Sequence, residues 1–145
     1  MPDTTAHDRF AIEERGLPAA LTLGGYNEQE WYYISILQMD NNPCTERQRK
    51  ATAQDKGYAT WRGMLICDEY PFNGTTQGGA LNFARGRVSL RFVPIAEGRV
   101  QKNKLDEFYD LCGIETVDRS PVHSLFGVAP KADGDQSATD HVCNR

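Results

Sequence analysis

The chain has 145 residues and a formal net charge of −4, with 39% hydrophobic and 25% charged residues. These values are typical of a globular protein, and we expect one domain over residues 1–145 with a polar tail over 131–145. They exclude collagen-like and coiled-coil proteins, and no apolar run approaches the roughly 18 residues of a bilayer span. We therefore expect no membrane partner. The mild acidity argues against binding of polyanions by bulk charge, although a local basic face with a metal ion can still bind phosphate.

In the first half of the chain, the pattern predicts one strand and one helix. Residues 1–30 are only weakly patterned, whereas Trp31 to Leu37 is rich in aromatic and β-branched residues, which favours a strand. The pair Asn42-Pro43 is a good helix start, because Asn caps and Pro needs no N–H partner in the first turn. We expect a basic, exposed helix over 45–54.

Two further strands are expected in the second half. Met64 to Cys67 is a short buried strand that ends before Pro71, because proline cannot donate to a strand ladder. Residues 73–79 are a flexible loop containing an Asn-Gly turn. Residues 87–93 alternate between apolar and polar, which predicts a half-buried strand with a basic outer face. Its apolar residues are Val88, Leu90 and Phe92, and its outer residues are Arg87, Ser89 and Arg91.

A helix is expected over 101–112, with Gly113 as its stop. Its apolar residues recur at i, i+3, i+4 and i+7, which places them on one stripe: Leu105, Phe108, Tyr109 and Cys112. The opposite face carries Asn103, Asp106, Glu107 and Asp110. The order strand, loop, strand, helix predicts an α+β fold, a small single domain with an antiparallel sheet.

Four cysteines stand at 44, 67, 112 and 143, and none forms a C-x-x-C pair, so a zinc knuckle is not expected. Disulfides are the favoured interpretation, with three possible pairings, because Cys143 lies in a polar tail with little else to anchor it. Cys112 also fits the core as a free thiol. The N-terminus lacks the pattern of a signal peptide, which suggests a mature or excised domain, or export by another route.

Asp68 and Glu69 are the first candidates for chemistry, because they follow a buried strand and precede a proline turn. Neighbouring residues of an extended chain point to opposite faces, so one of them can face a site while the other braces the fold. A carboxylate pair can hold a hard cation or deprotonate a water molecule. By residue type alone, an ordinary solvated turn stays open as the alternative.

Two blocks of sequence carry a resemblance. The first is Cys67-Asp68-Glu69-Tyr70-Pro71-Phe72, followed by Thr75-Thr76-Gln77-Gly78-Gly79. The second is Val93-Pro94, Glu97-Gly98-Arg99-Val100-Gln101, Leu105 and Phe108-Tyr109. Together, over about residues 64–114, they resemble the NucA/NucB deoxyribonuclease family. The resemblance implies a reduced ββα-metal core, two strands and a helix around one divalent ion, Mg²⁺ or Mn²⁺.

The resemblance also implies an activity and a set of site residues. It indicates a metal-dependent, sequence-nonspecific DNA endonuclease in which Asp68 is the general base that activates water. Glu69 matches an adjacent site-shaping or ion-linked glutamate, Glu97 matches the acidic residue of the second block, and Gln101 matches its glutamine. Two positions depart from the pattern: Gln77 replaces a glutamate and Gly98 replaces an asparagine.

Further residues complete the expected site. Asn103 and Glu107 lie four apart on the expected helix, so with Glu69 they are candidate metal ligands, although a solvated helix face is the alternative. The candidate contacts to DNA are Gln77, Gln101 and four arginines. Arginines can bind phosphates without reading the base sequence, and the four candidates are Arg85, Arg87, Arg91 and Arg99. Charge balance and solubility explain these arginines equally well.

Other functions stay open beside hydrolysis of DNA. The departures at Gln77 and Gly98 fit a catalytically inactive relative that only binds nucleic acid or protein. The domain also fits the toxic part of a secreted effector, acting outside the producing cell and neutralised by a cognate inhibitor or immunity protein. An enzyme that cuts RNA is a further alternative, because phosphate contacts do not read the sugar.

Overall fold

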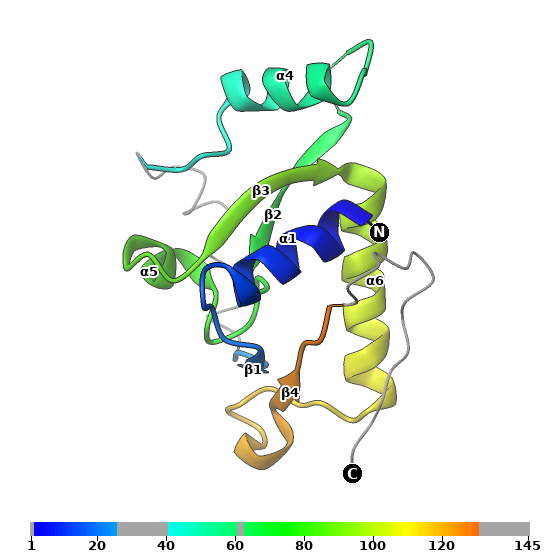
Figure 1. Cartoon of the computed structure of the whole chain (residues 1–145). Coiled ribbons are helices and arrows are strands. Elements are labelled where there is room, and N and C mark those ends of the chain that lie inside the picture. Colours follow the sequence, from blue (N-terminus) through cyan, green and yellow to red (C-terminus); the bar gives the residue numbers. More distant parts are fainter. Residues whose placement is uncertain (1, 26–40, 61–62, 131–145) are drawn as a thin grey trace.

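The computed structural model describes residues 2–25, 41–60 and 63–130, so the strand expected near 31–37 and the polar tail lie outside the described residues. No described helix is both long and apolar enough to cross a bilayer. The fold is α+β, as expected, with two small antiparallel sheets (Figure 1). In chain order the elements are α1 (Pro2–Glu13), β1 (Ala20–Thr22), α4 (Glu46–Asp55), β2 (Leu65–Tyr70), α5 (Gly79–Ala84), β3 (Ser89–Pro94), α6 (Ile95–Leu111), a 3₁₀ turn η1 (Pro121–His123) and β4 (Leu125–Gly127).

The centre of the fold is the antiparallel pair β2 and β3, a hairpin whose long connection contains α5. Its two faces meet different helices. Register pairs Cys67 with Phe92 and Asp68 with Arg91, so alternate residues share a face. One face packs its apolar residues against Ala53 of α4. The other face is covered by α1 and α6: α1 crosses the two strands, and its N-terminal end meets α6 (Figure 1).

The structure corrects two expectations about this hairpin. β2 continues past Cys67 to Tyr70, so Asp68 and Glu69 lie within the strand and not after it. Arg87 and Arg91 of the expected outer face are exposed, but Ser89 between them is buried, where its hydroxyl contacts His7 of α1. Only a covering helix could bury Ser89, and nothing in the alternation of residues 87–93 announces one.

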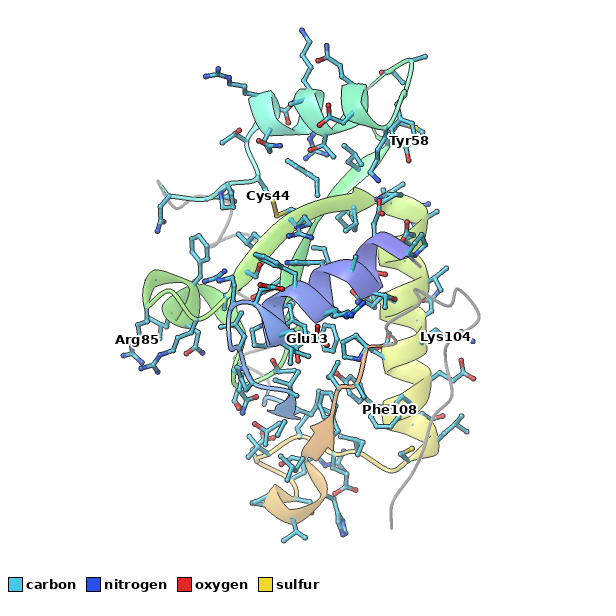
Figure 2. The ribbon with its side chains drawn as sticks, in the orientation of Figure 1. Glu13, Cys44, Tyr58, Arg85, Lys104 and Phe108 are labelled. Carbon is cyan, nitrogen blue, oxygen red and sulfur yellow. A yellow bond between two sulfur atoms is a disulfide. The ribbon has the colours of Figure 1, made fainter. Side chains whose placement is uncertain are left out.

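Helix α4 and its disulfide hold the far face of the hairpin. The helix matches its expected range, but its cap is Thr45, whose hydroxyl accepts from the backbone N–H of Gln48 at 3.1 Å. The expected cap, Asn42, accepts from Cys44 N–H instead. A disulfide joins Cys44 to Cys67 of β2 (Figure 2), and Cys112 is disulfide-bonded as well. The preference for disulfides is thus confirmed for the described cysteines, and Cys143 lies outside the described residues.

Helix α6 begins six residues earlier than expected, directly after Pro94, and this places Glu97 and Gln101 on the helix. Its expected apolar stripe is confirmed: Leu105, Phe108 and Tyr109 pack on the core that contains Tyr70 and Phe126. Gly113, with a φ of 62°, ends the helix as expected.

A close approach explains the glycine at position 98. A Cβ built there would lie 2.7 Å from Cγ2 of Ile66 in β2, nearer than real Cβ contacts allow. Gly98 therefore lets α6 lie close to the hairpin.

Gly98→Ala tests this packing. Alanine favours an exposed helix over glycine by about 1 kcal/mol, but here we expect the overpacking to dominate and to lower the free energy of unfolding by about 1–3 kcal/mol. Urea denaturation of Gly98→Ala, Ile66→Ala and the double variant measures it. Additive effects in this double-mutant cycle would show that an alanine side chain at position 98 does not clash with Ile66.

Candidate functional site

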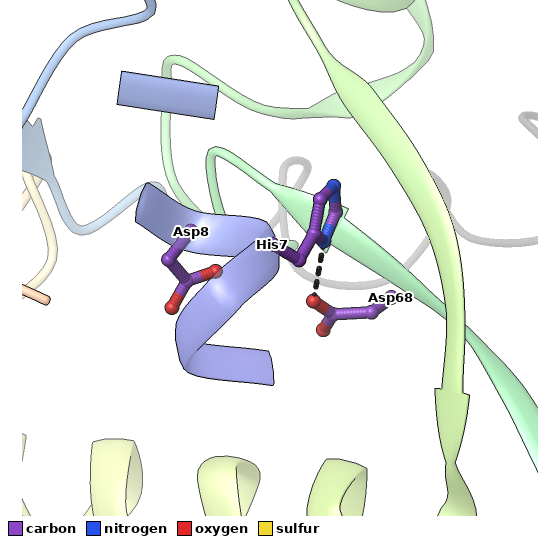
Figure 3. A group of neighbouring side chains, drawn as sticks. All are labelled: His7, Asp8 and Asp68. Carbon is purple, nitrogen blue, oxygen red and sulfur yellow. Dashed lines mark hydrogen bonds and ion pairs between the residues drawn. The ribbon is translucent and has the colours of Figure 1, made fainter. Parts of the chain in front are cut away.

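A buried histidine–aspartate pair joins α1 to the hairpin. Nδ1 of His7 lies 2.7 Å from Oδ2 of Asp68, and Nε2 of His7 is hydrogen-bonded to Ser89 Oγ at 2.9 Å. The exposed fraction of His7 is 0% and that of Asp68 is 8%. Figure 3 shows this pair between the helix and the strands. The expected site carboxylate thus lies in a nearly closed space, with an imidazole as its partner.

A second carboxylate of α1, Asp8, lies beside this pair. The side-chain amide of Gln101 on α6 donates to its Oδ2 at 3.0 Å. Its other oxygen, Oδ1, is buried and has no hydrogen-bond partner. One ligand atom from each of His7, Asp8 and Asp68 lies within 4.8 Å of the others, so α1 and β2 bring three ligand groups to one point.

The electrostatics of this group follow from burial. Burial raises the pKa of Asp8 well above its usual value, and the nearby charge of Asp68 raises it further. Burial also raises the pKa of Asp68, while the contact with His7 opposes that shift. Both carboxylates are therefore costly to ionise without a positive partner between them.

The residues present fit a divalent cation. Imidazole nitrogen and carboxylate oxygen are ordinary ligands of divalent metals, and an unpaired buried oxygen such as Asp8 Oδ1 lacks what a cation supplies. One cation with bond lengths near 2.0–2.2 Å holds its ligand atoms about 3–4.5 Å apart, close to the spacing of this group.

Glu69 faces the other side of the hairpin and does not join this group. Its Oε1 accepts from the backbone N–H of Gly79 at 2.8 Å, and burial raises its pKa to about 7. A Cβ on the neighbouring Gly78 would lie 2.6 Å from the carbonyl oxygen of Phe72. Glu69 thus braces a tight turn before α5, as one residue of an adjacent pair was expected to do, although its Oε2 is buried without a partner.

Glu97 caps α1 from a distance. Its Oε1 accepts from the backbone N–H groups of Asp3 and Thr4, at 2.8 and 3.2 Å. These amides belong to the first turn of α1, where N–H groups lack partners within the helix. Like Asp68 and Gln101, Glu97 is thus a residue of the expected site that contacts α1.

The other expected site residues lie elsewhere. Gln77 binds β1, since its Oε1 accepts from Thr22 N–H at 2.9 Å. Asn103 and Glu107 are exposed on α6, and Glu107 pairs with Lys104 at 3.6 Å, outside the group around Asp68. The four expected DNA-binding arginines are all exposed: Arg85, Arg87, Arg91 and Arg99. The guanidinium of Arg91 lies over the ring of Phe10.

His7 and Asp8 were not among the expected site residues. They belong to α1, whose buried residues are Thr4, His7, Asp8 and Ala11. This stripe has helical spacing, i, i+3, i+4 and i+7, but it is mostly polar. The sequence signal for this helix is the recurrence of polar as well as apolar residues at helical spacing.

We predict that Glu97→Ala loosens α1. Loss of the remote cap should cost about 0.5–2 kcal/mol, as loss of other helix caps does. Hydrogen exchange of the amides of residues 2–13 should become faster, whereas Glu107→Ala, an exposed carboxylate on the same helix, is the matched control. Equal exchange in both variants would contradict the capping role.

Comparison with known proteins gives one family. The family model of deoxyribonuclease NucA/NucB matches residues 33–121, more than half of the chain. Comparison with curated proteins and with solved structures gave no significant match. The matched range contains β2, β3 and α6, with Asp68, Glu97 and Gln101, whereas α1 precedes it. The chain therefore belongs to the NucA/NucB deoxyribonuclease family.

Proposed function

We propose that this chain is a metal-dependent nuclease that hydrolyses phosphodiester bonds of DNA without sequence preference, at the site around Asp68. The observation that carries the proposal is the convergence of the two family blocks. β2 brings Asp68 and α6 brings Gln101 to the same buried point, where both lie next to Asp8. The elements are two strands and a helix, as in a ββα-metal core.

In this proposal Asp68 accepts the proton of the attacking water. The water oxygen bonds to phosphorus, and the bond from phosphorus to the leaving sugar oxygen breaks. A general base acts on water, so the narrow exposure of Asp68 is sufficient for this role. A divalent cation at this site supplies positive charge that stabilises the phosphate oxygens as they become more negative. His7 holds the Asp68 carboxylate in one position, and Ser89 in turn holds the His7 ring.

The exposed arginines support binding without sequence preference. Guanidinium groups contact phosphates, which are the same at every base pair. Arg85 and Arg87 lie in the segment that connects α5 to β3, and Arg99 lies on α6. All three are therefore close in sequence to elements of the site.

The Cys44–Cys67 disulfide supports a place of action outside the reducing cytosol, because such bonds persist in oxidising surroundings. We therefore propose that the protein acts after secretion or delivery. A toxic role that is neutralised by an inhibitor stays a prediction.

The burial of Asp68 favours one second function. Because α1 covers Asp68, the domain can bind DNA while the site stays closed. Such a catalytically inactive protein retards DNA in a gel but does not cut it, with or without a divalent cation.

Plasmid cleavage distinguishes these two functions. We expect nicking of supercoiled DNA with Mn²⁺ or Mg²⁺, none with EDTA, and a loss of about 10²–10⁴-fold in rate for Asp68→Asn, the range for a general base. Asp106→Asn, an exposed carboxylate that pairs with Lys102, should cut like the wild type. Retardation without nicking in either metal would leave only the binding function.

The arginine contacts have their own test. The affinity for duplex DNA should fall with salt, and Arg87→Gln and Arg99→Gln should each lower the slope of log K against log salt by about 1. Arg119→Gln removes an exposed charge in the loop after α6 and is the control. An equal slope in all four proteins would remove Arg87 and Arg99 from the DNA contact.

A further inference from the structure

We propose that α1 supplies two ligands, His7 and Asp8, to a divalent transition-metal site that Asp68 completes. Metal binding as such is argued from the described residues alone, whereas the metal's role in hydrolysis rests on the proposed function. Because α1 precedes the range matched by the family model, two of the three proposed ligands lie outside that range.

The unpaired oxygen of Asp8 is the first observation. Asp8 is 6% exposed and its Oδ1 has no hydrogen-bond partner, while one oxygen of its carboxylate lies within 4.8 Å of ligand atoms of His7 and Asp68. A buried carboxylate oxygen without a partner is strongly unfavourable, and a second carboxylate beside it makes the arrangement worse. A cation shared by Asp8 and Asp68 would give the unpaired oxygen a partner and would also offset the repulsion between the two carboxylates.

The second observation is that neighbouring groups hold the proposed ligands from behind. Nε2 of His7 contacts Ser89 Oγ, which fixes the ring with Nδ1 2.7 Å from Oδ2 of Asp68, and a bound cation would take the place of the proton between these two atoms. Gln101 donates to Oδ2 of Asp8, which leaves Oδ1 as the oxygen without a partner. Hydrogen bonds of this kind fix the orientation of metal ligands, and their loss commonly weakens metal binding by about 10–100-fold.

The donor set indicates the class of metal. Carboxylate oxygens suit Mg²⁺, Ca²⁺ and Mn²⁺, whereas an imidazole nitrogen suits first-row transition metals such as Zn²⁺ and Fe²⁺, and Mn²⁺ is the transition metal among the ions that carboxylates prefer. With one imidazole and two carboxylates, this site should prefer Mn²⁺ to Mg²⁺.

Metal binding should also strengthen the docking of α1. Two ligands come from the helix and one from β2, so a bound cation joins these elements directly. A ligand that binds only the folded state raises stability, so Mn²⁺ should raise the unfolding temperature of the full chain.

The test is a Mn²⁺ titration of the full chain, in which electron paramagnetic resonance measures the free Mn²⁺. The unfolding temperature is then measured with and without Mn²⁺. Asp8→Asn keeps the shape of the side chain and the acceptor for Gln101, but it removes the charge. We expect it to weaken Mn²⁺ binding by at least about 100-fold, more than loss of a supporting hydrogen bond does, and His7→Gln to act likewise. Without metal, Asp8→Asn should unfold at the same or a higher temperature, because a buried like charge has been removed.

The matched control is Asp110→Asn, since Asp110 lines an acidic hollow at the end of α6 where cations could gather. It should bind Mn²⁺ like the wild type. Undiminished binding by Asp8→Asn, or no binding by the wild type, overturns the proposal. Plasmid cleavage separates the two proposals: Asp8-dependent Mn²⁺ binding without nicking supports the metal site and rejects the nuclease. Nicking by Asp8→Asn at the wild-type rate and Mn²⁺ concentration rejects the ligand role of α1.

Discussion

The contact between His7 and Asp68 is the interaction on which the rest of the site depends. A carboxylate at the centre of β2, buried and without a partner, would cost several kcal/mol, and α1 brings the partner. The helix in turn depends on the hairpin, because its buried stripe is polar and finds its acceptors and donors only there. Apolar burial alone would therefore not dock α1, and its hydrogen bonds to Ser89, Asp68 and α6 determine its position.

The pleat of β2 divides two adjacent carboxylates between two tasks. Asp68 points to α1 and α6, whereas Glu69 points to the turn at Gly78 and Gly79 and accepts a backbone hydrogen bond there. Residues that are neighbours in a motif are thus separated by the thickness of a strand. A motif read only as a string suggests a paired acid and base, but its geometry gives one site carboxylate and one structural brace.

Local sequence patterns made much of this fold predictable. The apolar stripe of α6 from Leu105 to Cys112 and the stop at Gly113 lie where they were expected, and α4 lies within one residue of its expected range although its cap is Thr45. The family blocks also directed attention to Asp68 and Gln101, which the structure places next to Asp8. Helix α1 could not be found this way, because periodicity methods look for apolar stripes and its stripe is mostly polar. The early start of α6 was hidden by Gly98, which reads locally as a helix breaker.

The two departures from the family pattern have different structural consequences. Gln77 contacts β1 through Thr22, so its amide is committed to holding that strand. Gly98 lets α6 approach β2 at Ile66, and Gln101 lies three residues further along the same helix, where its amide contacts Asp8. A side chain at position 98 would hold α6 away from the hairpin and draw Gln101 away from α1. Glycine at position 98 therefore permits the close packing of α6 on β2, and the same helix brings Gln101 to Asp8 of α1.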